Sequence, residues 1–167
     1  MDKSYFETLS RYHRWAYGKL YDEVDRLPEG QYFASRKLFF DSVHGTLNHL
    51  LLVERIWMGR FTGNPYEFNG LDDEIIEAAV PLRDAIFAQC DAWDDYISAL
   101  DSSELELNIE YRNTRGEALA FPLQLLLGHV FNHATHHRGQ VSAALTQSGL
   151  PAPVMDLPYF LMEESDS

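Results

Sequence analysis

The sequence predicts an all-α protein, a four-helix bundle with a small hairpin between the third and fourth helices. Four segments of helical length carry apolar residues spaced by three and four positions, and one short stretch alternates with period two. The chain has 167 residues, of which 46% are apolar and 23% charged, as in a globular protein of one domain. We therefore expect residues 1–167 to form a single helix-bundle domain.

The first helix is expected from about Ser4 to Asp25. Ser4 is followed three residues later by Glu7, which is the pattern of a capping box at a helix start. Pro28 cannot continue the helical hydrogen bonds and ends this helix. Its apolar spacing runs through Phe6, Leu9, His13, Tyr17, Leu20 and Val24.

The second and third helices follow before the alternating stretch. The second is expected from about Asp41 to Phe61, with either Asp41 or Ser42 as its N-cap. Its apolar residues lie on more than one face, which predicts a largely buried helix. The third is expected to begin near Asp73 or near Val80, and to end at about residue 100.

The hairpin and the last helix complete the bundle. Apolar and polar residues alternate from Leu105 to Tyr111, a turn-like sequence follows, and residues 118–121 can return as the second strand. The fourth helix is expected to start at Pro122 and to end near Ser148, with Gly149 just beyond it. The apolar tail at 157–161 is expected to pack on the body of the bundle.

Charge and cysteine content exclude several classes of function. The chain carries 13 basic and 26 acidic residues, a net charge of −13, which disfavours binding to nucleic acid and to anionic membranes. Cys90 is the only cysteine, so no intramolecular disulfide can form. No apolar run reaches the ~18 residues of a membrane span, and residues 1–14 lack the apolar segment of a signal peptide. We expect a cytoplasmic protein.

Two histidines in the fourth helix indicate a metal site. The core-facing line that joins Val130 to Val141 passes through His133 and His137, which are four residues apart. Both imidazoles can therefore reach one ion from a single helical turn. The alternative, which weighs about equally for such a pair, is that both are core histidines satisfied by ordinary hydrogen bonds.

A third ligand from another helix would decide between these readings. His49 is the best candidate because it lies in the middle of the apolar second helix, and His13 and His44 compete with it. Spacing alone does not choose among the three. His129 lies one turn before His133 and either faces the ion as well or packs beside the site, whereas His136 is rotated about 100° from its neighbour and is expected to face elsewhere.

Two segments carry a family resemblance. Residues 129–140 read HVFNHATHHRGQ and resemble the fourth-helix signature of the DinB/YfiT-like metalloenzymes, in which a histidine, three residues and then His-Arg-Gly-Gln close the site. Residues 48–57, NHLLLVERIW, resemble the family's other ligand segment, and the ending at 149–161 is similar as well. The resemblance spans nearly the whole chain.

The resemblance implies a four-helix bundle, usually homodimeric, that binds a divalent metal ion through His49, His133 and His137. Relatives of this kind transfer groups or hydrolyse bonds with low-molecular-weight thiols as co-substrates. The resemblance thus implies a small-molecule substrate, and a metal-dependent S-transferase or hydrolase. The alternative is a non-catalytic metal-binding or stress-response protein built on the same bundle.

The chemistry of the ligands narrows the ion. Three neutral imidazoles leave a divalent ion at least one open position, which is typical of a catalytic site. Nitrogen ligands favour zinc or nickel, with iron, copper or manganese as further candidates, over magnesium or calcium. An open position can lower the pKa of bound water towards ~7 or hold a thiol as thiolate. Either chemistry is expected to weaken below about pH 6, where imidazoles become protonated. No organic cofactor motif and no dedicated catalytic residue is predicted.

Residues near the ligand motifs have less specific expectations. Glu54 and Arg55 are expected in surface or inter-helix ion pairs. Arg138 either holds a substrate carboxylate or forms a salt bridge to an acidic neighbour. Asn132 and Gln140 either orient a ligand histidine through its second nitrogen or make ordinary hydrogen bonds.

Outside those motifs, Cys90 is expected to be an inert core residue. Asp156 and Tyr159 either close the mouth of the site or anchor the tail. Aromatic residues of the first helix either form an exposed dimer face or belong to the core: Tyr12, Trp15 and Tyr21.

Overall fold

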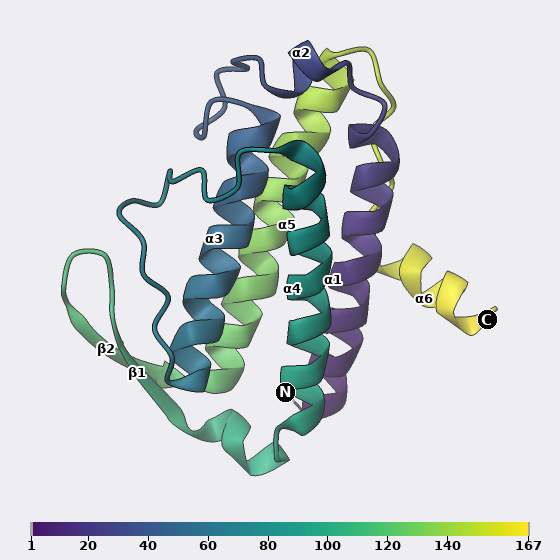
Figure 1. Cartoon of the computed structure of the whole chain (residues 1–167). Coiled ribbons are helices and arrows are strands. Elements are labelled where there is room, and N and C mark those ends of the chain that lie inside the picture. Colours follow the sequence, from purple (N-terminus) through teal and green to yellow (C-terminus); the bar gives the residue numbers. More distant parts are fainter. Residues whose placement is uncertain (1, 167) are drawn as a thin grey trace.

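Four long helices form the body of the protein in a computed structural model, which describes residues 2–166 (Figure 1). α1 and α3 each pack mainly against α4 and α5. The predicted all-α bundle and its small hairpin are confirmed. The long helices are α1 (Lys3–Val24), α3 (Val43–Thr62), α4 (Ala79–Ala99) and α5 (Leu123–Gln147).

The connection between α3 and α4 determines the topology. Residues 63–78 return along the outside of α3 before α4 begins, so α3 and α4 run in the same direction (Figure 1). Asn48, which is fully buried on α3, holds this crossover by accepting from the Ile76 backbone N–H and donating to the Ile76 carbonyl, both at 3.0 Å. A one-turn helix, α2 (Glu29–Tyr32), follows α1 and was not predicted.

Two helix starts show how caps are chosen. The predicted capping box at Ser4 is wrong: Asp2 is the N-cap of α1, and its carboxylate accepts from the Tyr5 backbone N–H at 3.1 Å. Ser4 donates its hydroxyl to the same carboxylate, which as a charged acceptor is the stronger cap for the first turn. At α3 the cap is Ser42, one of the two predicted residues, which accepts from Gly45 N–H at 2.9 Å.

The hairpin comprises β1 (Asn108–Arg112) and β2 (Ala118–Pro122), paired antiparallel with Tyr111 opposite Leu119. The predicted strand began earlier, at residue 105, but residues there form the 3₁₀ helix η1 (Ser102–Glu106), which buries Leu105 in the bundle core. Pro122 is the N-cap of α5, not its first residue, and Gly149 ends that helix with a left-handed φ of 81°. The ring of Tyr111 lies 5.0 Å from that of Trp57, which joins the hairpin to α3.

The C-terminal tail forms a helix, α6 (Leu157–Ser165), where only packing was predicted. α6 lies against α1 (Figure 1) and buries Phe160 against the rings of Tyr12 and Trp15, at 5.9 and 5.7 Å. These aromatic residues are therefore covered by the chain's own tail, and they do not form a free dimer face. Tyr159 is 51% exposed, so the tail is anchored through Phe160. No helix in residues 2–166 combines the length and apolarity needed to cross a membrane.

Candidate metal centre

Three imidazoles from two helices meet inside the bundle. His49 projects from α3, and His133 and His137 project from α5. The Nε2 atom of His133 lies 3.3 Å from Nε2 of His49 and 3.1 Å from Nε2 of His137. One nitrogen from each ring falls within 4.8 Å of the other two. The structure thus brings together the three histidines that the resemblance implies.

Burial around the cluster follows from the helix pattern. His133 and His137 are one turn apart on the α5 face that also buries Val130 and Val141, so both rings point into the bundle. His49 and His137 are only 3% and 7% exposed, and His133 is half-buried. The nitrogens therefore meet where protein surrounds them on most sides.

A backbone carbonyl determines which ring nitrogen of His49 carries the hydrogen. Nδ1 of His49 lies 2.7 Å from the carbonyl oxygen of Leu71, which comes from the crossover loop. Because a carbonyl can only accept, Nδ1 carries the hydrogen, and Nε2 keeps its lone pair. The crossover thus leaves the unprotonated nitrogen of His49 facing the other two rings.

Gln140 does the same for His137. Its Oε1 lies 2.7 Å from Nδ1 of His137, while its Nε2 lies 3.3 Å from Nε2 of the exposed His136. The amide therefore accepts from His137, whose Nε2 keeps its lone pair. Of the two residues considered for orienting a ligand, Gln140 contacts a site histidine, whereas Asn132 is exposed.

The donor set fits a divalent cation. Burial lowers the pKa of His49 to about 4, and burial together with His137 and His49 lowers that of His133 to about 3, so both rings are neutral at neutral pH. Nε2 of His49 and Nε2 of His137 are both acceptors that face Nε2 of His133, at 3.3 and 3.1 Å, so a hydrogen on that nitrogen serves only one of them, whereas a cation between the three rings satisfies all three. A tetrahedral ion with Zn–N bonds of about 2.0–2.1 Å places its nitrogens about 3.3 Å apart, close to the observed spacing.

Nearly the whole chain matches one known protein family. Residues 1–166 match the DinB family. The chain belongs to the DinB family. A similar protein is the "Protein DinB" of Bacillus subtilis (strain 168), which is 25% identical over 162 residues, covering 92% of this chain and 91% of that protein.

The remaining histidines of this DinB-family chain lie outside the cluster. Both ring nitrogens of His44 are engaged, Nε2 by the Asn48 side chain at 3.0 Å and Nδ1 by the Tyr32 hydroxyl at 3.2 Å. His129 is exposed, and its ring packs 5.2 Å from that of Trp57. Of its two predicted roles, it therefore has the one of packing beside the three histidines.

His13 belongs to a separate buried network. Arg138 donates to Nδ1 of His13 at 3.0 Å, and Nε2 of His13 lies 3.2 Å from Oε1 of Glu54. Glu54, only 2% exposed, also accepts from the Tyr17 hydroxyl and the Trp93 indole N–H, at 2.8 and 3.1 Å. Neither expectation for Arg138 holds: it is 1% exposed, out of reach of a substrate, and its direct partner is an imidazole.

Phe40 is a site residue that the sequence analysis missed. Its ring stacks on that of His49, with centroids 3.7 Å apart and planes at 16°, and contacts His137 edge-on at 5.5 Å. The Phe40 carbonyl lies directly against Gly45, where any Cβ would collide with it. A glycine within an otherwise buried, apolar helix was the available signal for this close approach.

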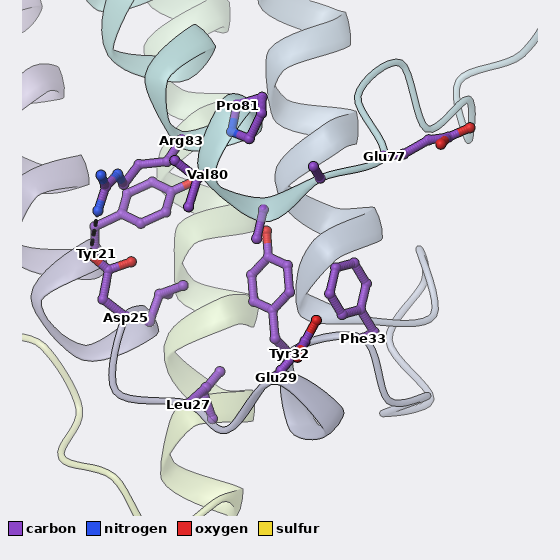
Figure 2. A pocket seen from close by; sticks show the side chains of 13 residues that line it. Tyr21, Asp25, Leu27, Glu29, Tyr32, Phe33, Glu77, Val80, Pro81 and Arg83 are labelled. Atoms are coloured by element: carbon purple, nitrogen blue, oxygen red, sulfur yellow. Dashed lines mark hydrogen bonds and ion pairs between the residues drawn. The ribbon is translucent and has the colours of Figure 1, made fainter.

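A cavity of about 270 Å³ opens beside the three histidines. His49 and His133 form part of its wall, together with residues of α3, the crossover and the hairpin. A larger cavity of about 660 Å³ lies between α1, α2 and the start of α4 (Figure 2). Its lining contains no histidine, and its cation Arg83 is already paired with Asp25 at 2.8 Å. Of these two cavities, only the smaller one borders the three-histidine cluster.

Proposed function

We propose that this chain is a metal-dependent enzyme of the DinB family in which His49, His133 and His137 hold one divalent ion. The observation that carries the proposal is the convergence of three Nε2 atoms, two of them left unprotonated by hydrogen bonds on the opposite side of the ring. The reaction class we propose is group transfer to a low-molecular-weight thiol, or hydrolysis, on a small-molecule substrate.

The chain's own residues orient the ligands and shape the space around them. The Leu71 carbonyl and the Gln140 amide hold two rings in the required tautomer, and Phe40 keeps the His49 ring from turning. The cavity beside the cluster would give a substrate access to an ion held by these three histidines. When bound, a zinc or nickel ion, or alternatively iron or manganese, supplies Lewis acidity that favours the deprotonated form of a thiol or water.

One observation favours a second candidate, a non-catalytic metal-binding or stress-response protein. Among residues 2–166, no Asp or Glu lines the cavity beside the three histidines, so no carboxylate is available there as a general base. A thiol that loses its proton on binding the ion needs no such base, and for that reason we place the transferase first.

Metal analysis of protein purified without a histidine tag tests the shared part of both candidates. We expect close to one zinc or nickel per chain, lost in His133→Ala and kept in the control His136→Ala, which removes an exposed histidine of the same helix. Trace metal that does not rise after incubation with zinc or nickel would count against both candidates.

Turnover separates the two candidates. Metal-loaded protein is assayed with a panel of thiols and electrophiles, beside the His137→Ala variant. Activity that depends on His137 supports the enzyme, whereas bound metal without turnover on any pair supports the non-catalytic protein.

We also propose a cytoplasmic homodimer. Support comes from the family resemblance and from exposed apolar residues on α6, such as Leu161 and Met162, which are 42% and 62% exposed. The free thiol of Cys90 is buried, and burial raises the pKa of this thiol. Both effects protect Cys90 from oxidation. Sedimentation at micromolar concentration is expected to give a dimer, and a purely monomeric profile would contradict this.

A further inference from the structure

Arg60, near the end of α3, is held rigidly in the wall of the histidine cavity. Its guanidinium carbon lies 4.4 Å from the ring centroid of Trp57 and 4.7 Å from that of Tyr111. One Nη atom donates to the backbone carbonyl of Arg112 at 3.1 Å. Two aromatic faces and one hydrogen bond therefore fix the plane of the guanidinium and leave its other N–H groups free for a ligand.

No acidic partner neutralises this guanidinium. Among residues 2–166, no Asp or Glu oxygen comes within 4.0 Å of Arg60, whereas Arg11, Arg14 and Arg83 each have such a partner. The chain has twice as many acidic as basic residues, 26 against 13, so acidic residues that could pair with a cation are abundant. A half-buried cation without a counter-charge costs free energy that an incoming anion can recover.

The cavity joins this cation to the three-histidine cluster. Its lining includes His49 and His133 from the cluster as well as Arg60. No carboxylate lines it, so its walls are positive or neutral in a protein of net charge −13. Further polar side chains that could donate a hydrogen bond lie on the same wall: Asn113, Thr114 and His129.

From these contacts we propose that Arg60 recognises a carboxylate on the substrate or thiol whose reactive end reaches the three-histidine cluster. This inference rests on the proposed function only in placing the reactive end of the ligand at the three-histidine cluster. A volume of about 270 Å³ restricts the ligand to a small molecule. A single guanidinium balances one negative charge and matches the planar fork of a carboxylate, whereas a phosphate dianion would remain partly uncompensated.

Calorimetric titration with two matched thiols tests the proposal. The probes are 3-mercaptopropionate and its neutral amide, 3-mercaptopropionamide, which have the same length and the same thiol. We expect the zinc-loaded protein to bind the carboxylate at least about tenfold more tightly than the amide, as for a charge-assisted hydrogen bond. Inorganic phosphate should compete with the carboxylate only weakly, and equal affinities for the two thiols would overturn the proposal.

Variants locate the preference at Arg60. Arg60→Gln should bring the two affinities within about twofold, and Arg60→Lys should keep part of the preference, because it keeps the charge but not the fork. The control Arg115→Gln removes a cation from the exposed hairpin turn, outside the cavity, and should leave the preference unchanged. A preference that survives in Arg60→Gln would assign the carboxylate to another residue.

A metal-free arm separates this inference from the proposed function. Chelator-treated protein should bind both thiols more weakly yet still prefer the carboxylate, because Arg60 does not depend on the ion. Metal content should be the same in Arg60→Gln as in the unaltered chain. Protein that binds no metal but prefers the carboxylate would refute the metal proposal alone, and metal-loaded protein without a preference would refute the role of Arg60 alone.

Discussion

Two histidine-containing clusters lie between the helices of this bundle, and they are built in opposite ways. In the first, Glu54, His13 and Arg138 alternate acid, imidazole and base, so each charge faces a partner of the chain itself. In the second, the Nε2 acceptors of His49 and His137 both face Nε2 of His133, and no acid lies among the three. Both clusters are largely buried, but only the first contains groups of opposite charge, Glu54 and Arg138.

The difference supports the second cluster as the one that binds a ligand. Burial tends to raise the pKa of Glu54, but His13 and the Tyr17 hydroxyl reverse this and hold it below its ordinary value, so the acid is charged inside the fold. In the second cluster, burial and neighbouring imidazoles all disfavour a proton on His133. Buried polar groups that satisfy one another stabilise a fold, whereas two acceptors that converge on one neutral imidazole cannot both be satisfied by it.

The largest expected effect concerns the self-contained cluster. Glu54→Ala leaves the Tyr17 hydroxyl and the Trp93 indole N–H without their acceptor, and it removes the carboxylate that lies 3.2 Å from Nε2 of His13. We expect a loss of about 3–5 kcal/mol in the free energy of unfolding, measured by urea denaturation. A loss below about 1 kcal/mol would show that the network is not a stabilising one.

The next effect concerns the incomplete cluster. Zinc at about a thousandfold excess over its dissociation constant should stabilise the protein by about 4 kcal/mol, seen as a rise in melting temperature that chelator reverses. His133→Ala should abolish the rise, and His136→Ala should keep it. An equal rise in both variants would place the ion elsewhere.

A smaller effect is expected at the residue that orients His137. Gln140→Leu removes the acceptor of the Nδ1 hydrogen and leaves all three ligands in place. Metal affinity should fall about 10- to 100-fold, as is usual for a lost partner of a ligand histidine, with little change in metal-free stability. The measurement is a competition titration against a zinc-binding dye, and an unchanged affinity would show that Gln140 has no orienting role.

The last prediction concerns the pH dependence of metal-free stability, to which both titratable groups of the first cluster contribute with the same sign. Burial lowers the pKa of His13 below 6.5, and the pKa of Glu54 lies below 4.5, so the unfolded chain binds more protons than the fold in acid. Stability should therefore fall as the pH drops, from about 6.5 for His13 and from about 4.5 for Glu54, by at most about 1.4 kcal/mol per pH unit for each group. The slope below pH 4.5 should shrink in Glu54→Gln, and melting curves from pH 7 to 3.5 measure it.

The helices and the meeting of two of these histidines could be predicted from the chain because both follow from local spacing. The position of His133 and His137 on one face needs only 3.6 residues per turn. The choice of His49 over His13 and His44 came from the family resemblance, since rotation about a helix axis is set by packing that no spacing encodes. Phe40 and Leu71 reach the site from irregular loops, where periodicity gives no signal.

The partners of the first cluster were missed for a similar reason. The spacing of residues along its own helix does not predict the partners of Glu54, because Tyr17, His13 and Trp93 all come from other helices. Arg60 was missed because its aromatic neighbour Tyr111 belongs to the hairpin, more than forty residues away in sequence. Contacts between distant elements are a property of the assembled bundle.

The hydrogen bond from His49 to Leu71 ends on a main-chain atom, and this has a consequence for how the protein can vary. Any amino acid at position 71 offers the same carbonyl, so exchanges there leave the bond intact as long as the crossover keeps its path. The path depends on Asn48, the residue beside His49, whose amide is tied to Ile76. Selection to preserve this hydrogen bond would therefore act on the side chain at position 48 and not on the one at position 71.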